Sequence, residues 1–305
     1  MKVALITTAP KFIEGLRLEE EAKALGYDFT TVNVGHSSYI LEKGKLVLIA
    51  ETCKNLKQGN FKKEIIDLKQ YDTILMQRMF KCIKEISPII KDARKNGVRV
   101  FDNNLTKHNY VINKVVDEVK LGVAGILTPK TIHSRDFESL PILAEKIGYP
   151  IIFKNTNKGK GVGVYKFDSK DQLTTKIKEL ESLGKKASGF LIQQLINYKH
   201  DLRVLVVGDS IFTMERIPKQ GEFRANFSLG GSVKPFSLNE EIKQFAIKAI
   251  RAVGLNIAGV DVLIDDQGTN YILEVNHTPG FVGMEKALGE NIGKKIIQFS
   301  VENAY

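Results

Sequence analysis

The sequence has 305 residues, of which 43% are hydrophobic and 26% are charged, as is typical of a globular protein. No apolar run approaches the roughly 18 residues of a membrane-spanning helix, so we expect no membrane segment and a cytoplasmic protein. The net charge is +10, but the lysines are spread along predicted helices close to glutamates, so we expect no nucleic-acid partner. Cys53 and Cys82 lack metal-ligand spacing and predict reduced thiols.

The first third of the chain alternates predicted strands and helices. Strands are predicted at 2–7, 29–34, 73–77 and 99–101, and helices at 14–25 and 83–96. Such alternation predicts a parallel α/β sheet. The glycine fingerprint of a dinucleotide fold is missing, since Gly15 stands alone after the first strand, so we expect no NAD site.

The pattern changes after a helix predicted at 107–121. Strands are then predicted at 151–154, 162–167 and 190–196, with a helix at 169–183. Gly208 and Asp209 join two apolar runs and predict a hairpin. The helix that follows is amphipathic, with Asn239 as its N-cap and Gly254 as its C-terminal stop.

Oxygen-bearing side chains are placed on a further predicted hairpin at 259–276. Because side chains alternate along a strand, Ile272, Glu274 and Asn276 share one side. A loop of two or four residues places Asp261 across from Ile272 or Glu274 on that side, whereas a loop of three or five residues does not. Together the three oxygen donors suit Mg²⁺. Taken singly, each carboxylate is better explained as a solvent-facing residue, so the cluster needs a phosphate site beside it.

A glycine loop supplies a candidate phosphate site. Lys154 ends a predicted strand, and Gly159, Gly161 and Gly163 follow it. Glycines let backbone N–H groups approach phosphate oxygens, and a lysine at the end of a strand adds a positive charge. This glycine pattern alone is weak evidence, and no Walker loop is present. Lys114, on the preceding helix, is either a second phosphate lysine or an ordinary surface residue.

Arg224 and Asn226 lie in a loop that ends in two glycines. An arginine fork suits a transferring phosphoryl group or a substrate carboxylate. An arginine in a surface salt bridge explains the sequence equally well.

The ordered set of these segments resembles the ATP-grasp fold, and more specifically the RimK-type alpha-L-glutamate ligases. The matching segments are Lys114, 150–164, 190–209, 221–232, 258–264 and 273–297. The resemblance runs from residue 107 to the C-terminus and implies an α/β (α+β) chain in three parts. These are a parallel α/β pre-ATP-grasp domain (1–106), an N-terminal ATP-grasp subdomain with the phosphate loop (107–189), and a C-terminal subdomain with the metal and substrate site (190–305). The last two parts would clamp ATP.

The resemblance implies an ATP-dependent carboxylate–amine ligase. ATP would phosphorylate a carboxylate, and an amine would displace the phosphate to give an amide or peptide bond. The implied partners are an amino acid, with glutamate as the first candidate, and a peptide, protein C-terminus or cofactor that bears the carboxylate. The implied cofactors are ATP and two Mg²⁺ or Mn²⁺ ions.

The family motifs also imply roles for individual residues. Lys114 and Lys154 would hold the nucleotide phosphates beneath the loop of Gly159, Gly161 and Gly163; Gln193, Gln194, Leu195 and Ile196 would form the adenine hinge, with Asp201 at the ribose; Arg224 and Asn226 would face the γ-phosphate and acyl oxygens; and Asp261, Glu274 and Asn276 would bind the metal ions.

Two departures from the family pattern leave alternatives open. His277 stands where the family usually has a small residue, and His277-Thr278 resembles the LysX-like branch, which acts on an amino-group carrier protein. Ser228 and Leu229 replace a His-Arg pair, which removes a candidate substrate-binding cation. The alternatives are a LysX-like ligase and a non-catalytic ATP-binding regulator, although the complete metal set argues against the regulator. A homo-oligomer is left open.

Overall fold

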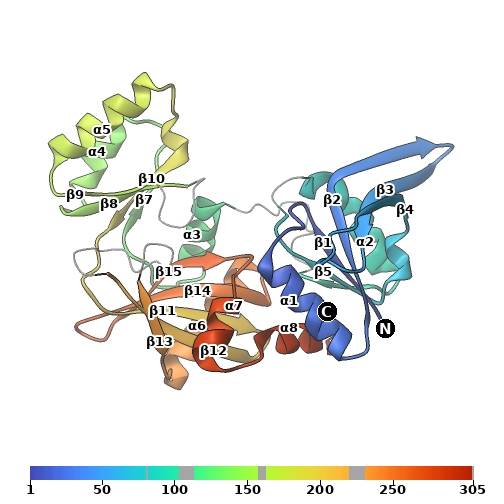
Figure 1. Cartoon of the computed structure of the whole chain (residues 1–305). Helices are drawn as coiled ribbons and strands as arrows, with labels where there is room; N and C mark the ends of the chain where they lie inside the picture. The colour runs from blue at the N-terminus through green and yellow to red at the C-terminus, as the bar shows by residue number, and fades with distance from the viewer. Residues whose placement is uncertain (80–81, 103–112, 157–162, 220–230, 304–305) are drawn as a thin grey trace.

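The computed structural model of the chain describes residues 1–79, 82–102, 113–156, 163–219 and 231–303. These residues form three sheets, each accompanied by helices (Figure 1). Among them, no helix is both long enough and apolar enough to cross a membrane. Cys53 is buried and Cys82 half-buried, and both thiols are free.

The first sheet has six strands. In their order across the sheet these are β4 (Lys62–Ile66), β3 (Lys45–Cys53), β2 (Asp28–Glu42), β1 (Lys2–Thr7), β5 (Thr73–Met76) and β6 (Arg99–Phe101). The four predicted strands are confirmed as β1, β2, β5 and β6, which run parallel as expected.

β3 pairs antiparallel with both β2 and β4, so the sheet is mixed: its parallel part was predicted, and the two antiparallel pairings at one edge were not. Lys43 and Gly44 join β2 to β3 with positive φ angles of 50° and 74°. Positive φ at both central residues defines a type I′ turn, and a two-residue loop can join only antiparallel strands. This turn is hard to predict from the sequence, because Lys-Gly stands where type I′ turns usually have Asn-Gly or Asp-Gly.

Helices cover both faces of the first sheet. They are α1 (Ile13–Ala24) and α8 (Ile292–Glu302) on one face, and α2 (Ile83–Lys95), preceded by the short helix η1 (Leu68–Gln70), on the other. β1 directs Val3 and Leu5 to the first face and Ala4 and Ile6 to the second. The predicted helices at 14–25 and 83–96 are confirmed, and the last helix of the chain returns to the first sheet (Figure 1).

The second sheet is antiparallel and has four strands. In order they are β7 (Thr131–Ile132), β10 (Phe190–Gln194), β8 (Ile151–Asn155) and β9 (Val164–Phe167), accompanied by α4 (Ser139–Ala144), α5 (Lys170–Ser182) and the short helix η3 (Ala187–Gly189). The helix predicted at 169–183 is confirmed as α5. The helix predicted at 107–121 is found as α3 (Lys114–Val123), and residues 107–112 lie outside the described residues.

β10 is the central link of the second sheet, since it pairs with both β7 and β8. The expected division between residues 189 and 190 would separate β10 from these neighbours. In the structure the second sheet includes β10 and extends to Gln194, five residues beyond that division. The three-part division itself remains a prediction.

The third sheet has five antiparallel strands. In order they are β13 (Ser232–Pro235), β12 (Ser210–Ile217), β11 (Tyr198–Val207), β14 (Ile257–Asp265) and β15 (Asn270–Asn276), accompanied by α6 (Glu240–Val253) and α7 (Val282–Leu288). The hairpin predicted at Gly208-Asp209 is confirmed as β11–β12. The helix after it is confirmed as α6, with Asn239 accepting a hydrogen bond from the N–H of Ile242 and Gly254 in the left-handed region.

The two faces of the third sheet differ in what they contact. Along β11, Val204 and Val206 pack into the core beneath α6, whereas Leu205 and Val207 join the core shared with α1 and α8. Because side chains alternate, Arg203 continues the second of these faces. This face therefore changes from apolar to charged along one strand, and the candidate site lies at the charged end.

The β11–β12 turn offers a test of packing against α8. Gly208 has φ +61°, and a Cβ at this position would overlap the ring of Phe299 on α8. Gly268 has φ +82°, but a Cβ there would meet nothing within 4 Å. We expect Gly208→Ala to lower the free energy of unfolding by about 1–3 kcal/mol more than Gly268→Ala, because overpacking adds to a similar backbone strain. Urea denaturation measures both losses, and equal losses would contradict tight packing of α8 on this turn.

Candidate active site

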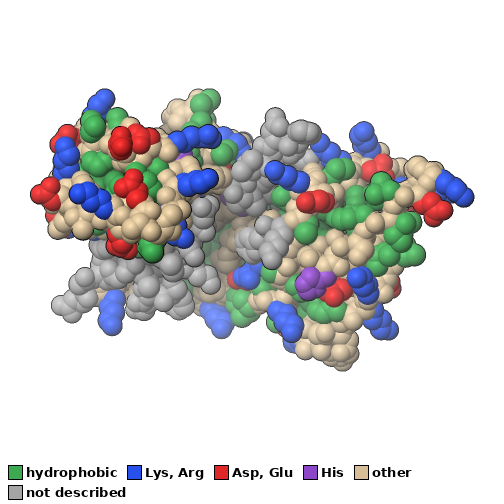
Figure 2. All heavy atoms as spheres, turned by 90° about the horizontal axis from the view of Figure 1, so that it is seen from above, with side chains coloured by type: hydrophobic (Ala, Val, Ile, Leu, Met, Phe, Trp, Pro, Cys, Tyr) green, Lys and Arg blue, Asp and Glu red, His purple; other side chains and the backbone are tan. Residues whose placement is uncertain are grey.

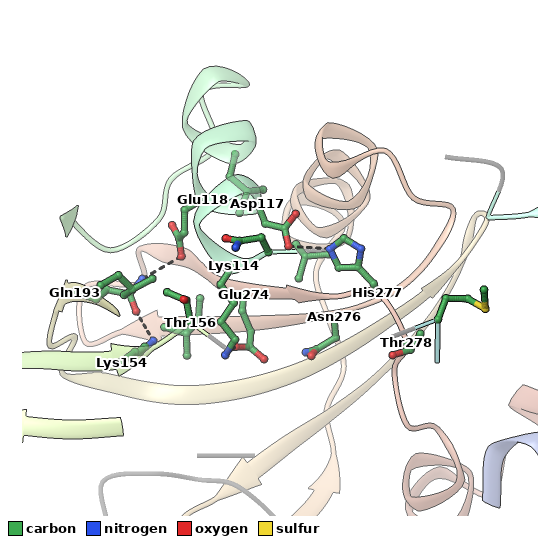
Figure 3. A pocket seen from close by; sticks show the side chains of 16 residues that line it. Lys114, Asp117, Glu118, Lys154, Thr156, Gln193, Glu274, Asn276, His277 and Thr278 are labelled. Atoms are coloured by element: carbon green, nitrogen blue, oxygen red, sulfur yellow. Dashed lines mark hydrogen bonds and ion pairs between the residues drawn. The ribbon is translucent and has the colours of Figure 1, made fainter. Parts of the chain in front are cut away.

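A cavity of about 380 Å³ lies where α3 meets β8, β10 and β15. Its walls carry both predicted phosphate lysines and two of the three predicted metal ligands (Figure 3). Viewed from above, the molecule is hollowed between the part with α4 and α5 and the part with the first sheet (Figure 2). The cavity has the size of a small-molecule site.

Lys114 and Glu274 form an ion pair across the cavity, with 2.9 Å between Nζ and Oε2. Lys114 is the first residue of α3, whose N-terminus is capped by the side chain of Asn113. Burial alone would raise the pKa of Glu274, but the positive charges of Lys114 and then Arg203 lower it to about 2. Glu274 is therefore a carboxylate at any physiological pH.

Lys154 lies in β8, and its Nζ donates a hydrogen bond to Oε1 of Gln193 on β10. Burial lowers the pKa of the Lys154 ammonium, and the nearby charge of Lys114 lowers it further, whereas Glu274 opposes the shift. Two ammonium groups thus share one cavity, and among the described residues only Glu274 forms an ion pair with either of them. An anion such as a phosphate would stabilise both of them.

Glu118 lies one turn along α3 from Lys114 and contacts the same glutamine as Lys154. Nε2 of Gln193 donates to Oε1 of Glu118 at 3.3 Å and to Oγ1 of Thr131 at 3.2 Å. Burial raises the pKa of Glu118 to about 7, although the charge of Lys154 opposes this shift. Glu118 is therefore partly protonated at neutral pH.

His277 follows β15 directly and is buried against α3. Its Nε2 lies 2.8 Å from Oδ2 of Asp117, and the two side chains are only 4% and 8% exposed. Since Lys114 and Asp117 are one turn apart, α3 and the end of β15 are joined by two neighbouring polar contacts (Figure 3). His277 thus fixes the end of the strand that carries Glu274.

Asp261 lies opposite Glu274, one of the two pairings expected for a loop of two or four residues, but five residues (265–269) separate the paired Ile264 and Asn270, so the expected loop length was wrong. The pairing of Asp261 with Glu274 depends on a β-bulge. Val262 pairs with Ile272, and Asp261 pairs with Glu274, so Leu273 is an extra residue in β15. Without this bulge, Asp261 would face Leu273.

The bulge also changes which side chains of β15 share a face. Ile272 and Val275 both enter the core beneath α6, although they are three residues apart. Glu274 and Asn276 line the cavity instead. The expectation that Ile272 shares their side was therefore wrong, because strict alternation fails at a bulge.

Two arginines hold Asp261. Nε of Arg203 lies 2.9 Å from Oδ1 of Asp261, and Nη1 of Arg216 donates to Oδ2 at 2.9 Å. Arg216 also donates from Nε to Oδ1 of Asp201 at 2.9 Å. Burial raises the pKa of Asp201 to about 6, although Arg216 opposes this, so the pair is still ionic at pH 7. The role of Asp201 at a ribose stays a prediction.

The donor chemistry of Asp261, Glu274 and Asn276 fits Mg²⁺, which prefers carboxylate and amide oxygens. Nδ2 of Asn276 is buried and has no hydrogen-bond partner among the described residues, so this N–H group is left to donate to an anion such as phosphate, whereas a metal ion would be bound by Oδ1 of the same amide. Both carboxylates are held by protein cations, namely Lys114 and the two arginines. Within the described ranges no three His, Cys, Asp or Glu side chains cluster as a metal site.

The other predicted site residues are distributed as follows. Gln194 ends β10, its N–H donates to the carbonyl of Lys130 at 2.8 Å, and Leu195 and Ile196 follow directly. Gly163 has φ 72°. Four further predicted residues lie outside the described residues: Gly159, Gly161, Arg224 and Asn226. Their roles remain predictions.

Sequence reasoning missed four charged residues of this region: Asp117, Glu118, Arg203 and Arg216. On α3 the acidic pair has the appearance of an ordinary helix surface. In β11 and β12, however, charges interrupt otherwise apolar strands, and burial of a charge requires a partner. That signal was present in the sequence.

Comparison with known proteins agrees with this architecture. Residues 110–300 match the model of the RimK-like ATP-grasp domain. The chain is 34% identical to a "Probable alpha-L-glutamate ligase" of Thioalkalivibrio sulfidiphilus, over 100% of this chain and 96% of that protein. It is 28% identical to a protein of the same name from Pasteurella multocida, over 97% and 93% of the two chains.

Solved structures share the fold at low sequence identity. The ATP-grasp ligase PsnB, complexed with a phosphomimetic variant of its minimal precursor, Mg and ADP, superposes with a TM-score of 0.70, 15% identity and coverage of 98% and 97% of the two chains. The macrocyclase MdnC of Microcystis aeruginosa, bound to the precursor peptide MdnA, gives a TM-score of 0.70, 18% identity and coverage of 99% and 100%.

The chain belongs to the RimK-like ATP-grasp family. It has the ATP-grasp fold and is an ATP-grasp ligase, an enzyme that forms carbon–nitrogen bonds.

The pKa of Glu118 leads to a test by pH. Because this pKa is about 7 in the folded protein and 4.5 in a free glutamate, the stabilisation by protonated Glu118 is fully present below pH 4.5 and is lost as the pH rises through about 7. We expect Glu118→Gln, which cannot ionise, to gain about 1–3 kcal/mol in unfolding free energy relative to the wild type over this range. Urea denaturation at several pH values measures the gain.

Burial also raises the pKa of Asp102 to about 6, like that of Asp201, but both groups are present in both proteins, so their effects cancel in the difference. The exposed Glu138→Gln controls for the loss of one charge. A difference between Glu118→Gln and the wild type that does not change with pH would contradict the assignment.

Proposed function

We propose that this ligase joins an amino acid to a carboxylate through an acylphosphate, with glutamate as the first candidate for the amino acid. A carboxylate oxygen attacks the γ-phosphorus of ATP and ADP departs. The amine of the amino acid then attacks the acyl carbon and phosphate departs. The carrying observation is the cavity in which Lys114, Lys154, Glu274 and Asn276 meet.

In this proposal Lys114 and Lys154 bind the phosphates of ATP. Both are cations held in one cavity, and burial and the charge of Lys114 lower the pKa of Lys154. A bound polyanion would favour the charged form of both lysines and so offset this destabilisation. The loop with Gly159, Gly161 and Gly163 covers the phosphates, and Gln193 to Ile196 with Asp201 bind the nucleoside. Arg224 and Asn226 act on the transferring phosphoryl group and the acyl oxygens.

Asp261, Glu274 and Asn276 hold Mg²⁺ in this proposal, and Mn²⁺ and a second ion belong to the same hypothesis. When bound, the metal neutralises phosphate charge during transfer. A related ligase of the same fold was solved with Mg and ADP. When nucleotide enters, Lys114 exchanges its carboxylate partner for phosphate, and Glu274 is released as an ionised donor.

The acceptor is a peptide, a protein C-terminus or another carboxylate-bearing molecule. Relatives are named alpha-L-glutamate ligases, and solved neighbours carry precursor peptides, which supports this class of substrate. A LysX-like ligase acting on a carrier protein is the second candidate. His277, which suggested it, is buried against Asp117, and such a contact positions β15 whatever the substrate is.

An ADP-release assay over the common amino acids and acidic peptide acceptors tests the proposal. With Mg²⁺, ADP should form only when a matching pair is present, and mass measurement of the product identifies the amide. Glu274→Gln should reduce ADP release on the order of 100-fold, because charge stabilisation in the transition state is lost. Glu290→Gln, at an exposed position, is the matched control.

Thermal stabilisation by ATP shows whether each variant still folds and binds nucleotide. A wild type that binds ATP but releases no ADP with any pair would be a regulator, and the ligase proposal would then be abandoned.

A further inference from the structure

The first sheet has a topological switch point beside the cavity. β1 lies between β2 and β5, and the chain leaves β1 through α1 and leaves β5 through α2, on opposite faces of the sheet. In open α/β sheets the crevice at the carboxyl ends of such strands is the usual place for a ligand. Here that edge is formed by the residues after Thr7 and after Met76.

Arg78 occupies this edge in a strained conformation. Its φ is 53°, which is uncommon for a residue with a side chain and frequent at functional sites. Oγ1 of Thr8 donates to the carbonyl of Arg78 at 2.8 Å, so the end of β1 holds the strained backbone in place. The guanidinium lies 4.6 Å above the ring of Phe12.

The guanidinium is oriented yet still accessible. Nη2 lies 3.4 Å from Oε2 of Glu14, a long contact, and 36% of the Arg78 side chain is exposed, against 12% for Glu14. α1 begins at the same edge after Phe12, whose side chain has no polar atom to cap the helix. The positive end of the α1 dipole therefore adds to the charge of Arg78.

Contacts on both sides connect this edge to the cavity. Met79, the next residue after Arg78, lines the cavity, as does Thr278 on the opposite segment. Gly280 follows closely, and a Cβ on it would lie 3.0 Å from Oε1 of Glu14. Arg78 and Glu14 therefore adjoin the end of the cavity that Thr278 lines, whereas Lys154 and Gln193 line it from β8 and β10.

We propose that Arg78 binds a carboxylate of the incoming amino acid, with Glu14 as the residue that positions the guanidinium. This inference rests on the proposed function. The acceptor carboxylate must leave any ion pair to be phosphorylated, whereas the amino acid reacts through its amine and keeps its own carboxylate throughout. A bidentate guanidinium suits such a group.

Binding of L-glutamate, its α-amide and its γ-amide tests the inference by calorimetry, with Mg²⁺ and a non-hydrolysable ATP analogue present. Arg78→Gly is the chosen variant, because glycine adopts positive φ without strain and the fold should be kept. Its Kd for L-glutamate should rise about 10- to 100-fold, the loss of a charged hydrogen-bonding partner. Its Kd for the amide that lacks the recognised carboxylate should stay near the wild-type value. Arg94→Ala, on the exposed side of α2, should bind all three ligands as the wild type does.

Three results would overturn the inference: unchanged binding of L-glutamate by Arg78→Gly, an equal loss for all three ligands, or no binding of any of them by the wild type. ADP release is measured in parallel. If the wild type releases ADP without binding L-glutamate, the inference fails and the ligase proposal stands. If it binds L-glutamate through Arg78 but never releases ADP, the inference stands and the proposed ligation fails.

Discussion

The contact between Lys114 and Glu274 sets the geometry of the cavity. It joins the start of α3 to the middle of β15, and the buried contact between Asp117 and His277 repeats the connection one turn further along α3. The Lys114–Glu274 pair is partly exposed, whereas the Asp117–His277 pair is buried. In the proposed function, the first contact would open to phosphate while the second keeps α3 on β15.

The charges around the cavity balance one another in the absence of a ligand. Asp201, Arg216, Asp261 and Arg203 form a chain of alternating sign along β11, β12 and β14. A buried charge without a partner costs several kcal/mol, so each group needs its neighbour. The proposed metal ligands Asp261 and Glu274 are accordingly found in ion pairs with arginine and lysine. In the proposed function, Mg²⁺ and phosphate would replace some of these partners.

Much of this arrangement could be predicted from the sequence. The apolar periodicity located α6, its cap at Asn239 and its stop at Gly254, because burial and capping are local properties. The pairing of Asp261 with Glu274 was one of two that were expected, but it arises through a β-bulge and not through the even-numbered loop on which the expectation depended. The bulge at Leu273 was not predicted, and Ile272 was placed on the wrong face because strict alternation was assumed along the whole of β15.

Long-range contacts were beyond the reach of local patterns. The contact between His277 and Asp117 joins residues 160 positions apart, and the sequence near either residue does not predict the other as its partner. The pairing of β10 with β8 likewise joins distant segments, which is why the expected division at 189/190 left β10 out of its sheet. The hairpin of β2 and β3 was missed for a local reason, the unusual Lys-Gly turn.

The return of α8 to the first sheet also affects the order in which the protein can fold during synthesis. Val3 and Leu5 belong to the same core as Ile296 and Ile297, which lie almost 300 positions later. Domains usually fold as units, starting at the N-terminus, while the ribosome is still adding residues. Here α1 can cover part of this face early, but α8, the second helix on it, follows the first sheet by about 200 residues. The core around Val3 and Leu5 is thus complete only when segments from both ends of the fold have come together.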